Sequence, residues 1–287
     1  MFDVCVVGSA NLDLVATVER LPAPGETVPG SSYAEYPGGK GLNQAVACAR
    51  AGASTAFVGA VGSDGAGAAL LDVMRDDGID ISGVVVASAP SGRALIFVSA
   101  EGENSIVVVA GANDTVAPAT PPPTTVVLAQ LEVPVATIEH AFRAAKAAGA
   151  TTVLNPAPVK PLPDSLVALC DVLTPNEHEV ELLGGVDRLR SLGAAAVIVT
   201  RGSEGADLHT SSGVEHIAAH RVVAVDTTGA GDCFSGSLCA RLAAGDALLD
   251  AMRYASVAAA LSTTVAGAVP SMPRRADVLS AASLSEG

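Results

Sequence analysis

The chain alternates between short apolar runs rich in valine and longer segments with helical spacing of apolar residues. Apolar runs of roughly four to eight residues that end at glycine or a polar residue are typical of buried parallel strands. Strands are predicted at 3–7, 54–58, 125–129, 151–155, 172–174 and 196–200, and helices at 43–51, 65–76 and 135–148. This alternation predicts an α/β fold, with a Rossmann-like, mostly parallel sheet and helices on both faces.

Two segments depart from this pattern, because apolar and polar residues alternate in them without helical periodicity. The first runs from Leu14 to Tyr36 and is interrupted by prolines and glycines; the second runs from Ser91 to Val109 and turns at Gly102-Glu103-Asn104. Such alternation is typical of strands joined by turns. We therefore expect a single domain, 1–287, that carries a small second sheet built from about 11–38 and 90–110. This small sheet is expected to cover the ligand-binding site of the domain.

The composition is that of a globular chain with an unusual core. Hydrophobic residues make up 49% of the 287 residues, which excludes a disordered chain, and an aromatic content of only 3% implies a core of alanine, valine and leucine. The net charge of -14 disfavours nucleic acid or an anionic membrane as a partner, because both select basic surfaces. A nucleotide ligand would therefore need a cation and backbone dipoles to neutralise its charge.

The cysteine and histidine spacings indicate no metal site or disulfide framework. The five cysteines are scattered and never spaced C-x-x-C, and the five histidines contain no H-E-x-x-H. The N-terminus leads into a strand without a basic leader, and no apolar run has the length and flanks of a membrane helix. We expect a cytoplasmic protein.

The stretch Asp226-Thr227-Thr228-Gly229-Ala230-Gly231-Asp232 joins a predicted strand end at Val222 to Val225 to a small-residue helix at 233–242. Its glycines allow a tight turn and leave the first N–H groups of the helix unpaired, so that this helix start can bind phosphate. A carboxylate at Asp232 would be repelled by such an anion unless it takes a proton or faces a cation. The alternative is an ordinary first-turn acid that interacts favourably with the helix dipole.

Further polar residues lie where strands are predicted to end, which is where ligands bind in open α/β sheets. Asn11 and Asp13 follow the first strand, and Glu132 follows the strand at 125–129. These side chains are candidates for binding hydroxyls. The alternative for Asn11 and Asp13 is a strand-end turn in which they cap their own backbone. Gly38-Gly39-Lys40-Gly41 is no Walker loop; it either brings the backbone and Lys40 close to a ligand or forms a glycine hinge with a solvated lysine.

Together these motifs resemble the ribokinase family of carbohydrate kinases. The resemblance includes the 226–232 stretch and, in the family's order, Gly8-Ser9-Ala10-Asn11-Leu12-Asp13, Gly38-Gly39-Lys40-Gly41-Leu42-Asn43-Gln44-Ala45, Gly102-Glu103-Asn104, Gly111-Ala112-Asn113, Gln130-Leu131-Glu132, Asn155-Pro156-Ala157-Pro158, Thr174-Pro175-Asn176-Glu177 and Thr200-Arg201-Gly202. It covers nearly the whole chain. The resemblance implies an ATP-dependent sugar kinase that transfers the γ-phosphate of ATP to the 5-hydroxyl of D-ribose. Another sugar or a nucleoside, such as fructose, adenosine or pseudouridine, is the alternative substrate on the same fold.

The resemblance also implies roles for individual residues. Asp232 is expected to act as the general base, beside an anion hole formed by the N–H groups of Gly229, Ala230 and Gly231. The sugar-binding positions are Asn11, Asp13, Gly39, Lys40, Asn43 and Glu132, and the nucleotide-binding positions are Asn176, Thr200, Gly202 and Ser256. Glu179 is expected to act on Mg²⁺ indirectly, and K⁺ to be held by Asp226, Thr227, Gly267 and Ser271. The small sheet is expected to close over the sugar and to pair with its copy in a homodimer.

The sequence departs from the family pattern in two places. The segment between Glu179 and Ala196 is short, so that a peripheral helix is expected to be truncated or missing. Ser256 stands where asparagine or histidine is common, and Val265-Ala266 where basic residues are common, which affects nucleotide preference and leaves the chemistry intact. A non-catalytic sugar sensor would be expected to lose the base or the anion loop, and this sequence keeps both. No G-x-G-x-x-G follows a predicted strand, which disfavours an NAD-binding protein.

Overall fold

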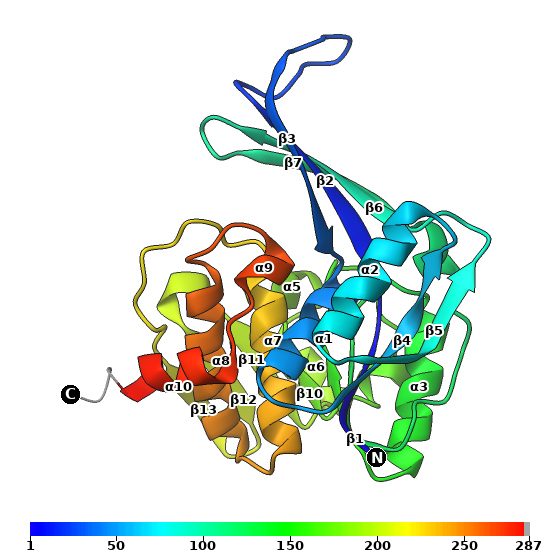
Figure 1. Ribbon diagram of the computed structural model, residues 1–287. Helices are drawn as coiled ribbons and strands as arrows, with labels where there is room; N and C mark the ends of the chain where they lie inside the picture. The colour runs from blue at the N-terminus through cyan, green and yellow to red at the C-terminus, as the bar shows by residue number, and fades with distance from the viewer. Residues whose placement is uncertain (284–287) are drawn as a thin grey trace.

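The strands of the alternating segments form one nine-stranded sheet in the computed structural model, which describes residues 1–283 (Figure 1). The strand order is β13-β12-β11-β10-β9-β8-β1-β4-β5. Neighbours are parallel except where β12 and β13 add an antiparallel edge. The strands are β1 (Phe2–Val7), β4 (Thr55–Gly62), β5 (Asp80–Ala87), β8 (Thr124–Ala129), β9 (Thr151–Leu154), β10 (Val172–Leu173), β11 (Ala196–Thr200), β12 (Ala206–Thr210) and β13 (Gly213–Ile217).

Helices cover both faces of this sheet, and each face has its own core. In β1, Val4 and Val6 face one core, whereas Cys5 and Val7 face the other, as the twofold repeat of a strand requires. The first core is covered by α1 (Lys40–Arg50), α2 (Gly65–Asp76), α7 (Ala230–Ala243), α8 (Leu248–Ser262), α9 (Ala268–Ser271) and α10 (Arg275–Ser283). The second is covered by α3 (Val135–Ala147), α4 (Asp164–Val167), α5 (Glu177–Leu182) and α6 (Val186–Ser191). The predicted fold class is confirmed.

A four-stranded sheet projects from the body next to the carboxyl end of β1 (Figure 1). Its order is β3 (Gly30–Gly38), β2 (Asn11–Val18), β6 (Gly92–Ser99) and β7 (Asn104–Val109), with β2 and β6 parallel and the outer pairs antiparallel. All six residues of β7 are exposed. We call this sheet the lid. Asn11 and Asp13 lie in the first residues of β2, within the segment expected to form the small sheet, and not in the alternative strand-end turn, because the chain leaves β1 directly into the lid.

The strand end expected at Val222 to Val225 is wrong, because 218–229 contains no strand or helix. Within residues 1–283 this segment pairs with no strand; the N–H groups of Val225 and Asp226 both donate to the carbonyl of Thr263, directly after α8. Val223 is 87% exposed, so the alternation of valines here does not mark a buried face. The short segment after Glu179 folds into α5 and α6, of six residues each.

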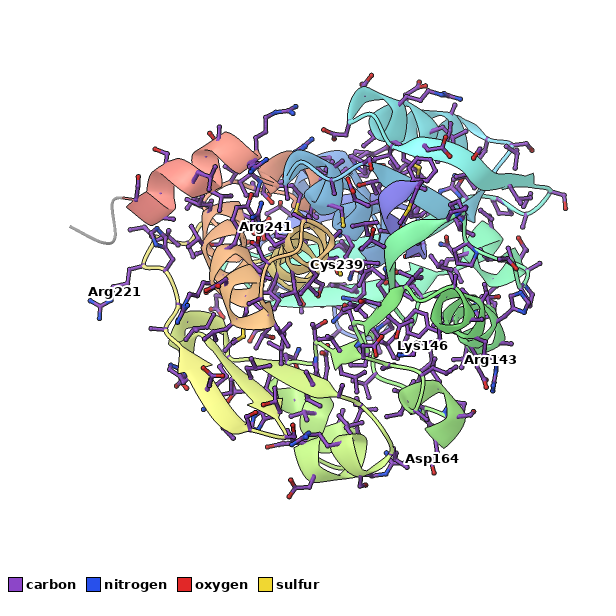
Figure 2. The ribbon with its side chains drawn as sticks, turned by 90° about the horizontal axis from the view of Figure 1, so that it is seen from below. Arg143, Lys146, Asp164, Arg221, Cys239 and Arg241 are labelled. Carbon is purple, nitrogen blue, oxygen red and sulfur yellow. The ribbon has the colours of Figure 1, made fainter. Side chains whose placement is uncertain are left out.

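Most of the buried hydrophobic side chains are alanine, valine or leucine, which confirms the predicted core. All five cysteines are free and buried, and Figure 2 shows Cys239 of α7 inside the molecule and Arg221 of the 218–229 segment at its surface. No helix within residues 1–283 is long and apolar enough to cross a membrane.

Candidate active site

The residues singled out in the sequence gather where the parallel strands end and where α1 and α7 begin. The segments that follow β1, β8, β9, β10 and β11 supply Ser9, Glu132, Asn155, Asn176 and Gly202. The N-terminus of α7 faces them across two connected cavities. The topology therefore brings together groups that are up to about two hundred residues apart in the chain, as expected at the carboxyl edge of an open sheet.

Two glycines, Gly229 and Gly231, shape the start of α7, and the absence of a side chain has a different consequence at each. Gly229 caps the helix at φ 78°, and a Cβ there would lie 2.9 Å from the Cβ of Ala268. A Cβ at Gly231 would meet no atom within 4 Å, because this position opens into the cavities. Within residues 1–283 the N–H groups of Gly229 and Gly231 have no hydrogen-bond partner, whereas that of Ala230 donates to the carbonyl of Thr227 at 3.2 Å. Two of the three expected anion-hole donors are therefore free to bind an anion.

Asp232 lies in the first turn of α7, only 5% exposed, with both carboxylate oxygens hydrogen-bonded. Oδ2 accepts from Nδ2 of Asn43 and Oδ1 accepts from Nε2 of Gln44, each at 2.9 Å. Gly236 allows α1 and α7 to come this close, because a Cβ there would lie 2.5 Å from the carbonyl oxygen of Gln44. Oδ1 of Asn43 is buried and has no partner within residues 1–283, so it can accept a hydrogen bond from a ligand hydroxyl next to Asp232.

Four carboxylates, those of Asp13, Glu132, Glu179 and Asp232, and the ammonium group of Lys40 are close enough to influence one another. Burial, with smaller contributions from the charges of Glu132 and Asp232, raises the pKa of Asp13 from 3.8 to about 7. The pKa of Lys40 is raised chiefly by the charge of Asp232. Oε2 of Glu132 accepts from the hydroxyl of Ser9 and, at 2.9 Å, from the N–H of Lys40. This cluster suits a ligand that presents several hydroxyl groups.

The other two expected sugar-binding residues, Asn11 and Gly39, lie where β2 of the lid meets the start of α1. Oδ1 of Asn11 accepts from Nδ2 of Asn113 at 2.7 Å. Gly39 caps α1 at φ 88°, and a Cβ there would lie 2.7 Å from the backbone nitrogen of Asn11. The root of the lid and the start of α1 can therefore meet only through glycine at this position.

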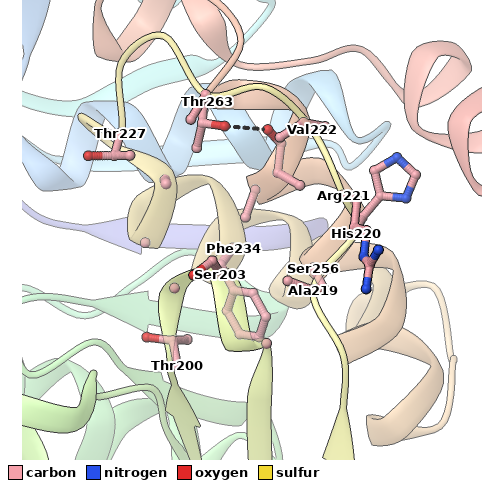
Figure 3. Close-up of a pocket in the computed structure, with 17 residues that line it drawn as sticks. Thr200, Ser203, Ala219, His220, Arg221, Val222, Thr227, Phe234, Ser256 and Thr263 are labelled. Atoms are coloured by element: carbon pink, nitrogen blue, oxygen red, sulfur yellow. Dashed lines mark hydrogen bonds between the residues drawn. The ribbon is translucent and has the colours of Figure 1, made fainter.

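Two cavities meet at the start of α7. The smaller, of about 220 Å³, is lined by Lys40, Asn176, Glu179 and Asp232 among others. The larger, of about 460 Å³, is shown in Figure 3 and has a mostly apolar wall that includes Phe234 and Ala259, with Ser256 beside them. Both cavities are lined by Thr200, Thr227, Ala230 and Gly231. A ligand with an apolar ring in the larger cavity would place an attached anionic group at the unpaired N–H groups of α7.

Asn176 and Glu179 form a capping box at the start of α5, which fixes both side chains. The N–H of Glu179 donates to Oδ1 of Asn176, and the N–H of Asn176 donates to Oε2 of Glu179, each at 2.8 Å. Burial is the main cause of the raised pKa of Glu179. Residues 1–283 contain no cluster of three or more His, Cys, Asp or Glu side chains that could hold a metal ion. A divalent ion beside Glu179 would have only this one carboxylate from the capping box, so phosphate oxygens of a bound nucleotide and water would have to complete its coordination. Mg²⁺ bound to a phosphate chain meets this requirement.

Of the residues expected to hold K⁺, Asp226 and Gly267 are joined by a hydrogen bond, and Thr227 directly follows Asp226. Oδ1 of Asp226 accepts from the N–H of Thr228 at 2.9 Å and its Oδ2 from the N–H of Gly267 at 2.8 Å, across 41 residues. Burial alone would raise the pKa of Asp226, but these hydrogen bonds together lower it, which favours the charged form. Each carboxylate oxygen of Asp226 keeps a lone pair. Ser271 is buried in α9, where its hydroxyl donates to the carbonyl of Ala268 at 2.7 Å. This donor set fits a monovalent cation.

The sequence did not reveal several residues that build the site. Gln44, Ser9, Asn113 and Asn155 belong to motifs that were noted without a role for these positions, and Phe234 lies two residues past Asp232. Gln44 is fully buried and bonded to Asp232. The one sequence signal for a role of Gln44 was its position: it is a polar amide directly before the apolar run 45–49 of a predicted helix, where a buried polar side chain needs a partner.

The raised pKa of Asp13 leads to a prediction about stability. Between about pH 4 and pH 7 the folded chain binds more protons at this carboxyl than the unfolded chain, so the free energy of unfolding falls as the pH rises through that window. Asp13→Asn removes this loss. We expect the variant to be more stable than the wild type at pH 8, by roughly 1–4 kcal/mol, and the difference to shrink toward zero at pH 4. Thermal unfolding of both proteins at pH 8 and pH 4 measures this difference in stability. An equal difference at the two pH values would contradict a raised pKa of Asp13.

Comparisons with known proteins agree with this arrangement. A model of the pfkB family carbohydrate kinases matches residues 1–275. A ribokinase of Staphylococcus aureus is 40% identical over 94% of this chain and 96% of its own, and a ribokinase of Bacillus subtilis is 39% identical over 97% and 98%. The structure of Arabidopsis thaliana ribokinase complexed with ribose and ATP has a TM-score of 0.91, with 32% identity and coverage of 98% of each chain.

Proposed function

The chain belongs to the pfkB family of carbohydrate kinases, and from that premise we propose that it transfers the γ-phosphate of ATP to the 5-hydroxyl of D-ribose. One observation carries this proposal: the Asp232 carboxylate lies in the same small cavity as the unpaired N–H group of Gly231. A base and an anion site side by side are what phosphoryl transfer to an alcohol requires. The relative that was solved with ribose and ATP supports this choice of substrates.

In the proposed reaction, the proton of the sugar hydroxyl moves to Asp232 as the hydroxyl oxygen attacks the γ-phosphorus and ADP leaves. The N–H groups of Gly229 and Gly231 stabilise the charge on the transferring phosphoryl group, and Lys40 in the same cavity adds a positive charge. Asn43 and Gln44 hold the carboxylate in place, so that the chain contributes mainly orientation and electrostatic stabilisation.

The sugar would be bound by Asn11, Asp13, Gly39, Lys40, Asn43 and Glu132, and the nucleotide by Asn176, Thr200, Gly202 and Ser256. The free Oδ1 of Asn43 supports the sugar assignment, since it can accept a hydrogen bond from a sugar hydroxyl. The larger cavity, with Ser256 and Gly202 in its wall, is supported as the site of the nucleotide base. Mg²⁺ carried by the nucleotide would neutralise phosphate charge, and Glu179, whose side chain is fixed by the capping box with Asn176, would act on the ion indirectly.

Rates of phosphorylation across ribose, deoxyribose, fructose, adenosine and pseudouridine test the proposal. D-ribose should give the highest kcat/KM, because a site built from groups that bind hydroxyls rejects analogues that lack them by up to about 10⁴–10⁵. If fructose or adenosine exceeds ribose tenfold or more, the substrate is another sugar or a nucleoside. A cytoplasmic location and the lack of nucleic-acid or membrane partners stay predictions from the sequence.

We expect K⁺ to activate the enzyme without touching substrate. The carboxylate of Asp226 accepts hydrogen bonds from the N–H groups of Thr228, in the turn before the anion hole, and of Gly267. Ala268, the residue after Gly267, lies next to Gly229 of the anion hole. A cation bound by Asp226, Thr227, Gly267 and Ser271 would therefore order the anion hole. The rate should rise when Na⁺ is replaced by K⁺, and Asp226→Asn should remove that rise. Equal wild-type rates in K⁺, Na⁺ and a bulky organic cation would exclude the site.

We further expect a homodimer through the lid. Ile106, Val107, Val108 and Val109 are each about half exposed along the edge strand β7, and Tyr33 is 63% exposed on the opposite edge strand, β3. Unpaired strand edges that carry apolar side chains tend to be covered by a partner. Light scattering at micromolar concentration should give twice the chain mass, and Val107→Lys should shift the protein toward the monomer. A fully active wild-type monomer would contradict this assembly.

A further inference from the structure

Gln44 is a fully buried amide in α1 whose hydrogen-bonding groups are all used. Its Nε2 donates to Oδ1 of Asp232 at 2.9 Å and to Oδ1 of Asn155 at 3.1 Å. Its Oε1 accepts from Nε2 of Gln130 at 2.6 Å. Gln44 and Gln130 are both 0% exposed, and Gln44 lines neither of the two cavities. A buried amide that contacts no ligand site directly, yet bonds the proposed base, has a role beyond packing.

The chemistry of the partners fixes the orientation of this amide. An ionised carboxylate can only accept hydrogen bonds, so the Gln44 nitrogen must face Asp232 and its oxygen must face Gln130. Asn155 is held in turn, because its Nδ2 donates to the carbonyl of Thr174 at 3.0 Å. The chain of amides runs from the end of β8 through α1 to α7 and the end of β9. It therefore ties Asp232 to the rigid edge of the main sheet.

We propose that Gln44 is a positioning residue that holds the Asp232 carboxylate in the rotamer needed for proton transfer. Gln44 and Asn43 each hold one carboxylate oxygen, but they differ in what else they do. Asn43 also offers a free Oδ1, so its loss would alter sugar binding together with the position of Asp232. Gln44 bonds two residues that line the smaller cavity, Asn155 and Asp232, and of these Asp232 is the one that would take part in proton transfer. The inference rests on the proposed kinase function with Asp232 as the base.

The first test is Gln44→Met, which keeps the size of the side chain and removes the amide. We expect kcat to fall about 10- to 100-fold, because a misplacement of about 1 Å in a reacting group can cost up to about 10²-fold, with little change in KM for ribose or ATP. Gln130→Met is the matched control, because it is equally buried and breaks a bond of the same network without touching Asp232. It should lower the melting temperature similarly and lower kcat several-fold less. Equal losses of kcat in the two variants would overturn the proposal.

The second test combines Gln44→Met with Asp232→Asn. Residues that act as a unit are non-additive, so Gln44→Met should cost little further kcat once Asp232 is replaced; a full additional loss would overturn the proposal. If Gln44→Met does not fold, Gln44→Glu keeps the length of the side chain, replaces the donor by a second carboxylate and should lower kcat at least as much. If Asp232→Asn keeps its turnover, the proposed function fails. If it loses turnover while both Gln44 variants keep theirs, only this inference fails.

Discussion

Replacement of Asp232 by asparagine is expected to lower kcat by about 10²- to 10⁴-fold, the range for loss of a general base. Asparagine keeps the size of the side chain and the geometry of the helix start but cannot take the proton of the sugar hydroxyl. Binding of sugar and nucleotide should change far less, because most of the groups expected to bind them lie in other elements. Steady-state kinetics for ribose and ATP, with the melting temperature of the same variant, measure both effects.

The competing explanation is that Asp232 is an ordinary first-turn acid, worth only about 0.3–1 kcal/mol of stability. Some loss of stability is expected in either case, since an asparagine would direct its own N–H groups toward Asn43 or Gln44, which both donate to this position. The deciding quantity is therefore kcat. Asp250→Asn is a matched control, because Asp250 is an exposed first-turn acid of α8 outside the site, and it should leave kcat unchanged. An Asp232→Asn variant that keeps more than about a tenth of wild-type kcat, outside the general-base range, would favour the structural role.

Much of the main sheet could be predicted because its strands are buried on both faces. Val4, Cys5, Val6 and Val7 are all 0% exposed, and a strand covered on both sides must be apolar at every position. The helix at 65–76 was predicted with the boundaries that the structure gives it, because Asp64 caps its first turn and Gly78 at φ 70° follows its end. In these segments local sequence and tertiary environment favour the same structure.

Strand pairing was harder to predict, because it depends on partners that are distant in sequence. Val222 to Val225 has the composition of a strand but no neighbouring strand, whereas β5 was missed although it pairs with β4. Val85 and Val86 in β5 are 62% and 58% exposed, since β5 is the edge strand of the sheet, and its pattern lacks the continuous buried run of a central strand. Composition identifies the residues that can form a strand, and the rest of the fold decides which of them do.

The same limit applies to the site. The motifs identified Asp232, Asn43 and the glycines of the 226–232 stretch, but spacing carries no information on which groups hold the carboxylate. Gln44 and Asp232 are 188 residues apart and meet only because α1 and α7 pack closely at Gly236. The N–H of Ala230 donates to the carbonyl of Thr227 and is therefore not free to bind an anion. This bond depends on the local turn geometry, which the spacing of the glycines does not determine.

The second large effect on activity is expected at Gly41, where α1 packs closely against the segment that follows β1. A Cβ at Gly41 would lie 2.4 Å from the nitrogen and 2.6 Å from the oxygen of Ser9. Both atoms belong to the backbone, so no side-chain rotation can relieve the contact. Gly41→Ala must therefore displace the start of α1 from the segment after β1, where the N–H of Leu42 donates to the carbonyl of Ser9 at 2.8 Å. Overpacking of this kind costs about 1–3 kcal/mol of stability.

The displacement of α1 should also reduce activity, since α1 carries the backbone N–H of Lys40 that bonds Glu132 and both amides that hold Asp232. We expect kcat/KM for ribose to fall about 10²-fold, because a shift of about 1 Å in a reacting group can cost that much. Gly65→Ala is the matched control: Gly65 also lies in the first turn of its helix, α2, but a Cβ there meets no atom within 4 Å. It should stabilise the protein by up to about 1 kcal/mol and leave kcat/KM unchanged. If Gly41→Ala behaves like Gly65→Ala in both measurements, the position of α1 is not what aligns Asp232.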